Sequence, residues 1–104
     1  MALEEHARQV AELLRLLANE NRLLLVCALL NGPRGAGELA AVVPGISRPA
    51  LSQHLHALRS AGLLRDEKRG QFVTYSLADP RLRAVLEVLR REYCPDETPE
   101  ERGV

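Results

Sequence analysis

Residues 46–64 read ISRPALSQHLHALRSAGLL, and this stretch decides the fold. Within it, Leu51, Leu55 and Leu58 recur at intervals of four and three residues. This spacing places them on one helix face and predicts that the face packs on a core. Ser47 is a favourable N-cap residue, and Pro49 falls in the first turn, where its missing N–H costs nothing. Gly62 ends the predicted helix.

The other face of this predicted helix is polar and free to contact another molecule. Arginine donates two hydrogen bonds to guanine, glutamine pairs with adenine, and serine bonds to either, so these residue types suit base edges in a DNA major groove. The candidate DNA contacts on the helix are Ser47, Arg48, Pro49, Ser52, Gln53 and His56. His54 lies toward the apolar side, so we expect it to be partly buried and hydrogen-bonded. On this stretch alone, an ordinary amphipathic surface helix is the simpler interpretation.

Hydrophobic periodicity predicts three helices before this stretch, over residues 4–18, 20–30 and 38–43. The second of them is apolar almost all round, which predicts that it forms the buried centre of the domain. Pro44-Gly45 makes a tight turn between the third helix and the quoted stretch. These two helices are therefore a helix-turn-helix candidate.

Beyond Gly62 the apolar spacing changes from helical to alternating. Residues 63–68 and 72–77 are predicted to be strands joined by a turn at 69–71. A β-hairpin that follows a helix-turn-helix is a wing, and a basic wing tip suits the minor groove or the flanking phosphates. The candidate wing contacts are Lys68, Arg69 and Gln71.

A last helix is predicted from Asp79-Pro80 to Tyr93, because the residue before Pro95 avoids the helical conformation. The predicted fold class is α+β, mainly α, with the order α-α-α-α-β-β-α of a winged helix-turn-helix. We expect one domain over residues 4–94 and a disordered acidic tail over 95–104.

The formal net charge of the chain is zero, but the charges are unevenly distributed. Residues 46–75 carry five basic against two acidic side chains, and residues 87–104 carry six acidic against three basic. A basic middle and an acidic end predict a surface that faces a polyanion and a solvated tail. No signal peptide is visible, and the longest apolar run, residues 23–30, is too short to cross a bilayer. We therefore expect a cytoplasmic protein without a membrane partner, in which thiols are reduced by default.

The predicted order of elements resembles the ArsR-type winged-helix repressors from about Val10 to Cys94. The motifs that carry the resemblance are residues 17–23 (LANENRL), 47–64 and 70–77 (GQFVTYSL). The resemblance implies a homodimer formed through the first and last helices, which reads an inverted-repeat operator in double-stranded DNA. The cysteines and the histidine that hold metals in other members are missing here, so no metal site and no cofactor are expected.

The two cysteines, Cys27 and Cys94, make the chain similar to the sulfide-responsive branch of that family, the BigR, SqrR and YgaV type. In that branch a cysteine at each of these places forms an intramolecular disulfide or polysulfide bridge. The resemblance implies a redox switch, in which reactive sulfur species or other oxidants bridge the pair and lower operator affinity.

Other functions remain open at this point. Cys27 has the simpler interpretation of a small buried hydrophobe. The pair would also suit a metal or metalloid sensor with two soft ligands. A thiol enzyme is disfavoured, because there is no Cys-x-x-Cys and no histidine placed by sequence to activate a thiol. A winged helix used only for protein contacts is the remaining possibility.

Overall fold

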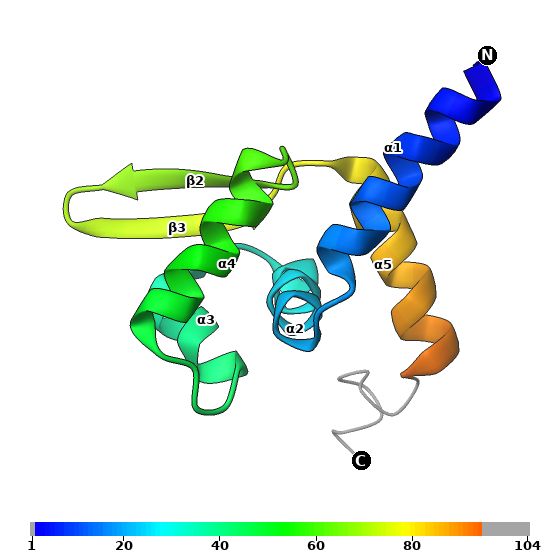
Figure 1. The fold of residues 1–104 in the computed structure, drawn as a ribbon. Coiled ribbons are helices and arrows are strands. Elements are labelled where there is room, and N and C mark those ends of the chain that lie inside the picture. The colour runs from blue at the N-terminus through cyan, green and yellow to red at the C-terminus, as the bar shows by residue number, and fades with distance from the viewer. Residues whose placement is uncertain (1, 95–104) are drawn as a thin grey trace.

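The structure, a computed structural model, describes residues 2–94 of the chain (Figure 1). The elements in chain order are α1 (Ala2–Leu17), α2 (Glu20–Ala28), the 3₁₀ turn η1 (Leu29–Asn31), β1 (Arg34–Gly35), α3 (Ala36–Val42), α4 (Arg48–Ser60), β2 (Leu64–Arg69), β3 (Phe72–Leu77) and α5 (Pro80–Tyr93). This order confirms the predicted mainly helical winged helix-turn-helix. The predicted tail, residues 95–104, lies outside the described residues.

The helix starts are set by side-chain caps that the sequence predicts. The Asn19 side chain accepts from the Arg22 N–H at 3.1 Å at the start of α2. The Ser47 hydroxyl accepts from the Ala50 N–H at 3.2 Å at the start of α4. At the far end of α4, Gly62 has a φ of +81°, a conformation that favours glycine and turns the chain into the wing.

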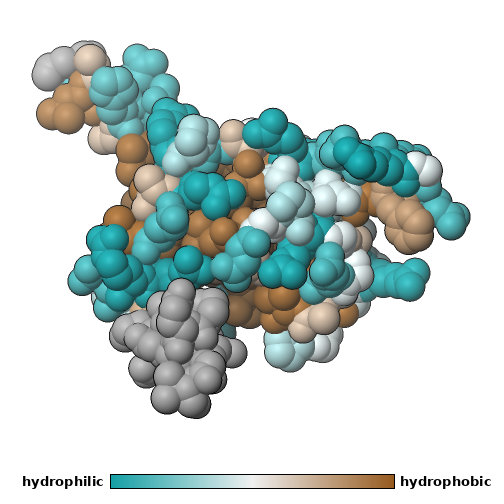
Figure 2. Space-filling view, turned by 180° about the vertical axis from the view of Figure 1, so that it is seen from behind, coloured by the Kyte–Doolittle hydropathy of each residue, from teal (hydrophilic) through white to brown (hydrophobic). Residues whose placement is uncertain are grey.

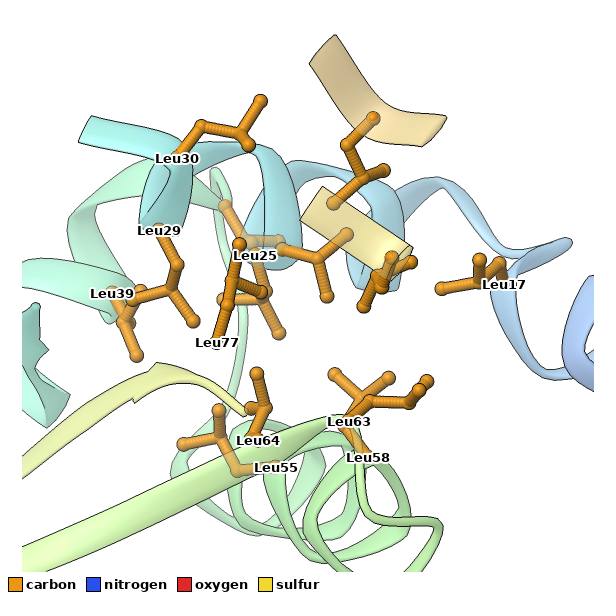
Figure 3. Close-up of a cluster of buried hydrophobic side chains, with 14 of the residues drawn as sticks. Leu17, Leu25, Leu29, Leu30, Leu39, Leu55, Leu58, Leu63, Leu64 and Leu77 are labelled. Atoms are coloured by element: carbon orange, nitrogen blue, oxygen red, sulfur yellow. The ribbon is translucent and has the colours of Figure 1, made fainter. Parts of the chain in front are cut away.

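The core is a single cluster of buried leucines and valines to which all five α-helices contribute. Figure 3 shows leucines from α4 and the start of the wing facing leucines from α2, η1 and β3. Within residues 2–94 no polar or charged residue is buried. Each helix therefore has one face against the cluster and leaves the other to solvent.

The prediction that α2 is buried on all sides was wrong in part. Leu25 and Val26 have no exposed surface, but Leu23 is 36% exposed and Leu24 is 40% exposed. The reason is that the core lies on one side of α2 only. The regular helix also ends earlier than predicted, at Ala28, and continues as the 3₁₀ turn.

The wing is a regular antiparallel hairpin, whose register runs from Leu64 opposite Leu77 to Arg69 opposite Phe72. The predicted turn was one residue too long, because Arg69 belongs to β2 and only Gly70 and Gln71 connect the strands. A further strand, β1, pairs with β3 and gives the sheet order β1-β3-β2. This strand was not predicted, because two residues are too few to show alternation.

Helices α1 and α5 lie on the side of the molecule opposite the hairpin (Figure 1). Figure 2 shows apolar side chains exposed on this side, next to α1. The large exposed apolar residues of the two helices are Leu3, Val10, Leu14, Val85, Val88, Leu89 and Tyr93. Both helices thus carry apolar surface that their own chain does not cover. No helix in the described part of the chain is long and apolar enough to span a membrane.

The neighbouring leucines of α2 give a matched test of this packing. Leu25→Ala is expected to lower the free energy of unfolding by about 2–5 kcal/mol, because it opens a cavity in a closely packed core. Leu24→Ala is expected to cost less than about 1 kcal/mol, because its side chain is partly in water already. Urea denaturation at one fixed protein concentration measures both values. Equal losses for the two variants would contradict this description of α2.

Candidate nucleic-acid interface and cysteine pair

Helix α4 begins beside α3 and runs across the hairpin, where it contacts β2 (Figure 1). Its three leucines, Leu51, Leu55 and Leu58, are buried as predicted. The candidate DNA contacts Ser47, Arg48, Pro49, Ser52, Gln53 and His56 are all exposed. The burial of one face of α4 therefore fixes which side chains are free to meet a ligand.

Two of these residues also have partners within the chain. The Ser47 oxygen accepts the capping bond from Ala50, which leaves the hydroxyl proton free to donate to an acceptor such as a phosphate. Nε2 of His56 lies 3.4 Å from the Ser60 hydroxyl, one helical turn further along the same helix. Neither contact removes the side chain from the exposed face.

The wing is joined to α4 by an ion pair that the sequence analysis missed. Nη1 of Arg59 on α4 donates to Oδ2 of Asp66 on β2 at 3.0 Å. Such a partly exposed pair contributes about 0–1 kcal/mol to stability. It matters more because it fixes the position of the wing relative to α4. The two residues belong to different elements and stand among other polar residues, so their sequence positions do not predict that they pair.

The alternation of β2 places the two basic residues of the wing tip on opposite sides. Lys68 shares the side of Asp66, toward α4, because side chains two apart point the same way. Arg69 is on the other side with Glu67, whose carboxylate its Nη2 contacts at 3.2 Å. Lys68 takes part in none of the ion pairs within residues 2–94. Gln71 is exposed in the turn.

The predicted interpretation of His54 is confirmed. It is partly buried, and its Nδ1 accepts a hydrogen bond from Nε of Arg22 at 3.1 Å. Burial lowers the pKa of His54, and the positive charge of Arg22 lowers it further. This imidazole is therefore held neutral inside the domain and is not part of the exposed face.

The two cysteines lie at the junction of α2 and α5. Cys27 is partly buried on α2, and Cys94 is exposed at the C-terminal cap of α5, where its N–H donates to the Arg90 carbonyl at 2.9 Å. Helix α5 is fastened to the segment after α2 by two arginines. Arg83 donates to the Leu30 carbonyl at 3.2 Å, and Arg90 donates to Oδ1 of Asn31 at 3.3 Å.

Three effects act on the pKa of the Cys27 thiol, of which two raise it and one lowers it. Burial raises its pKa, the charge of a Cys94 thiolate raises it further, and the charge of Arg90 lowers it. The fold thus brings Cys27, Cys94 and Arg90 into one electrostatic neighbourhood. The neighbouring Arg91 pairs instead with Glu92, at 3.3 Å.

The described residues contain no group of three or more histidine, cysteine or acidic side chains placed to hold a metal ion. Asp79, the acidic residue at the start of α5, is engaged by Arg81. Its Oδ2 accepts from Arg81 Nη2 at 3.0 Å, and its Oδ1 accepts from the Arg81 N–H at 2.8 Å. These hydrogen bonds hold the pKa of Asp79 below its usual value. This carboxylate acts as a helix cap and an arginine partner.

The helix-turn-helix of α3 and α4, followed by the β2-β3 wing, defines the winged helix-turn-helix class of DNA-binding domains. A family model described as "Bacterial regulatory protein, arsR family" matches residues 19–66. The transcriptional activator HlyU of Vibrio cholerae is 39% identical over 92 residues, covering 88% of this chain and 84% of that protein. The regulator YgaV of Escherichia coli is 36% identical over 94 residues, covering 89% and 94%. The crystal structure of the transcriptional repressor BigR from Xylella fastidiosa matches with a TM-score of 0.80 at 33% identity, covering 89% of this chain and 94% of that chain.

The chain therefore belongs to the ArsR family of bacterial regulatory proteins. It is a DNA-binding transcriptional regulator, which confirms the family expected from the sequence motifs. Two of the names attached to the expected branch, YgaV and BigR, are among the relatives. The relatives are named as regulators, in agreement with the expectation that the chain is not an enzyme.

The difference in exposure between the two thiols predicts their order of alkylation. In the reduced protein at neutral pH, iodoacetamide is expected to modify Cys94 about ten times faster than Cys27, because Cys27 is shielded and its pKa is raised. Peptide mass spectrometry over time gives both rates. In denaturant the two rates should converge, and equal rates in the folded protein would contradict the placement of Cys27.

Proposed function

We propose that this protein is a homodimeric transcriptional repressor whose affinity for its operator falls when Cys27 and Cys94 are bridged. The operator is an inverted repeat in double-stranded DNA, and the inducer is a reactive sulfur species or another oxidant. The observation that carries the proposal is the shared neighbourhood of Cys27, Cys94 and Arg90 where α5 meets the end of α2. The protein acts in the cytoplasm, where cellular thiols reverse the bridge.

The dimer follows from the uncovered apolar surface of α1 and α5. A groove of about 500 Å³ runs between these helices, and its lining includes Val10, Leu13, Leu82 and Val85. The exposed leucines and valines of both helices continue this apolar surface. A two-fold dimer covers the same patch on both copies, which removes this surface from water.

The exposed face of α4 supplies the base-reading side chains. In the dimer the two α4 helices enter the major groove at half-sites about one helical turn apart. Arg48, Ser52, Gln53 and His56 face the bases, while Ser47 and Pro49 lie at the start of the helix, beside the backbone. The wing residues Lys68, Arg69 and Gln71 reach the phosphates or the minor groove, with Lys68 on the side of α4.

Hydrogen disulfide or a longer polysulfide can oxidise the two cysteines, because its sulfane sulfur accepts the two electrons that disulfide formation releases. The exposed Cys94 thiolate attacks a sulfane sulfur and Cys94 becomes a persulfide; hydrosulfide leaves when the inducer is hydrogen disulfide, and a polysulfide anion one sulfur shorter leaves when it is a longer polysulfide. The Cys27 thiolate then attacks the inner sulfur of that persulfide, which releases hydrosulfide and forms the disulfide. The charge of Arg90 favours the Cys27 thiolate in this second step.

The bridge reaches DNA through α5. This helix carries Cys94 at its end and forms part of the proposed dimer surface, so a covalent link to α2 changes its position relative to the body of the domain. The hydrogen bonds of Arg83 and Arg90 hold that junction in the reduced protein. A shift of α5 alters the spacing of the two α4 helices, and half-site spacing is what an inverted repeat selects.

Mass spectrometry combined with DNA titration tests the switch. The probe is a fluorescent duplex that the reduced wild-type protein selects from a random-sequence pool. Sodium polysulfide is expected to yield an intramolecular bridge between Cys27 and Cys94 and to weaken binding at least about tenfold, a difference of about 1.4 kcal/mol. Dithiothreitol should restore both mass and affinity.

Cys27→Ser and Cys94→Ser are the matched controls, and each should bind DNA normally but fail to respond. If the bridge forms without loss of affinity, the cysteines are not a DNA switch. If the protein instead binds Zn²⁺ or As(III) stoichiometrically through both cysteines and releases DNA, the alternative of a metal or metalloid sensor with soft thiolate ligands is correct.

The DNA face is tested by salt dependence and base preference. Gln53→Ala is expected to cost about 1–3 kcal/mol and to relax the preference at one base pair of each half-site. Lys68→Ala should weaken binding to all sequences alike and reduce the slope of log affinity against log salt by about 1 per protomer. Arg8→Ala, on α1, is the matched charge control. A change in base preference with Lys68→Ala would contradict its proposed phosphate contact.

A further inference from the structure

One guanidinium group connects three helices of the domain. Arg22 lies in the first turn of α2, and its Nε donates to Nδ1 of His54 on α4 at 3.1 Å. Its Nη1 donates to the carbonyl oxygen of Leu16, in the last turn of α1, at 3.1 Å. Both hydrogen bonds are partly buried. Arg22 therefore joins the end of α1 to the middle of the helix that carries the candidate base-reading side chains.

The backbone of Arg22 is also held in place. Its N–H donates to the capping side chain of Asn19 at 3.1 Å. The residue that reaches toward α4 is thus fixed at the corner between α1 and α2, and its side chain has little freedom to follow α4 if that helix moves. The corner is part of the LANENRL motif, whose role the DNA face alone does not explain.

The contact requires a neutral imidazole at position 54. Nδ1 can accept from Arg22 only with its lone pair free, so the ring proton is on Nε2. A protonated ring would present an N–H to the guanidinium and place two positive charges side by side. Burial lowers the pKa of His54, and Arg22 on α2 lowers it further, with no carboxylate of residues 2–94 opposing them. The other histidine of α4, His56, is exposed beside Ser60.

We propose that Arg22 and His54 are positioning residues for DNA binding, and that the bond between them fixes the orientation of α4 relative to α1. Gln53 precedes His54 in the chain, so the rotation of α4 that satisfies this bond also sets the direction of the base-reading side chains. In a dimer formed through α1, the same bond aligns each α4 with the two-fold axis. This inference rests on the proposed DNA face and dimer. It adds that protonation of His54 breaks its hydrogen bond to Arg22, so that α4 is no longer held in this orientation.

Two substitutions at position 54 separate positioning from packing. In His54→Asn the amide oxygen takes the place of Nδ1 and accepts from Arg22, but the side chain does not titrate. In His54→Leu the acceptor is lost and the volume is roughly kept, which leaves the Arg22 donor without its partner. Both variants retain the leucine face of α4, and urea unfolding verifies that each is folded.

The experiment measures affinity for the duplex selected by the wild-type protein, from about pH 7.5, above the ordinary histidine pKa, down to the lowest pH at which urea unfolding still shows a folded protein. At the upper pH, His54→Asn is expected to bind within about threefold of wild type and His54→Leu about tenfold or more weakly. As the pH falls, wild type should lose more affinity than His54→Asn, which shares His56 and every other titratable group of the DNA face. The same difference between wild type and His54→Asn is expected when both carry His6→Asn, which removes the histidine of α1.

Linkage gives the same direction for stability. Because the pKa of His54 is lowered by folding, the unfolded chain binds more protons, so this contribution is complete above about pH 6.5 and is lost as pH falls through the folded value. The pH dependence of the free energy of unfolding should therefore be shallower in His54→Asn than in wild type.

The inference is overturned if His54→Asn and His54→Leu bind equally at neutral pH, or if the profiles of wild type and His54→Asn coincide. If His54→Leu does not fold, Arg22→Lys is the substitute, since lysine keeps the charge but cannot make both bonds. It should bind as weakly as His54→Leu was expected to. If wild type selects no duplex at all, the proposed function itself fails. If wild type selects a duplex but the variants do not differ as expected, only the inference about Arg22 and His54 fails.

Discussion

The burial of one small leucine cluster is the constraint on which the rest of this structure depends. A domain of this size has a single core, and every helix must place one face against it. Helix α4 meets this need with three leucines, so its polar face is exposed as a consequence of packing. Helices α1 and α5 meet it only in part and keep large apolar side chains in water. The same shortage of cover leaves exposed both the polar face of α4 and the apolar sides of α1 and α5.

The core also determines what the cysteines can do. Cys27 packs at the edge of the cluster, where burial raises its pKa, while Cys94 lies in solvent at the end of α5. In the proposed switch, the exposed thiol reacts with the inducer first, and the sheltered thiol then forms the bridge. Arg90 joins the two roles, because it holds α5 against the segment after α2 and favours the thiolate of Cys27.

Most of the fold could be predicted because it is encoded locally. The caps at Asn19, Ser47 and Asp79 and the alternation of β3 are signals that occupy a few consecutive residues. The exposure of the DNA face follows in the same way from the spacing of leucines. What the sequence did not reveal depends on contacts between distant segments, namely the pairing of β1 with β3, the bond from Arg59 to Asp66 and the bond from Arg22 to His54. The one-sided burial of α2 is of the same kind, since composition cannot tell which neighbours a helix has.

Ion pairs decide which basic side chains of this DNA-binding protein, whose formal net charge is zero, are available to phosphates. The basic region of residues 46–75 has a surplus of positive side chains, but Arg59 and Arg69 are engaged by the two acidic residues of the same region. Arg48, Arg65 and Lys68 are the basic residues of this region that take part in no ion pair within residues 2–94. A protomer with so few free cations gains only a modest nonspecific attraction, because that attraction scales with the number of phosphates neutralised. In the proposed dimer, the affinity therefore comes largely from base contacts made by two correctly oriented α4 helices. For this reason the hydrogen bonds that orient α4 matter more here than they would in a strongly basic protein.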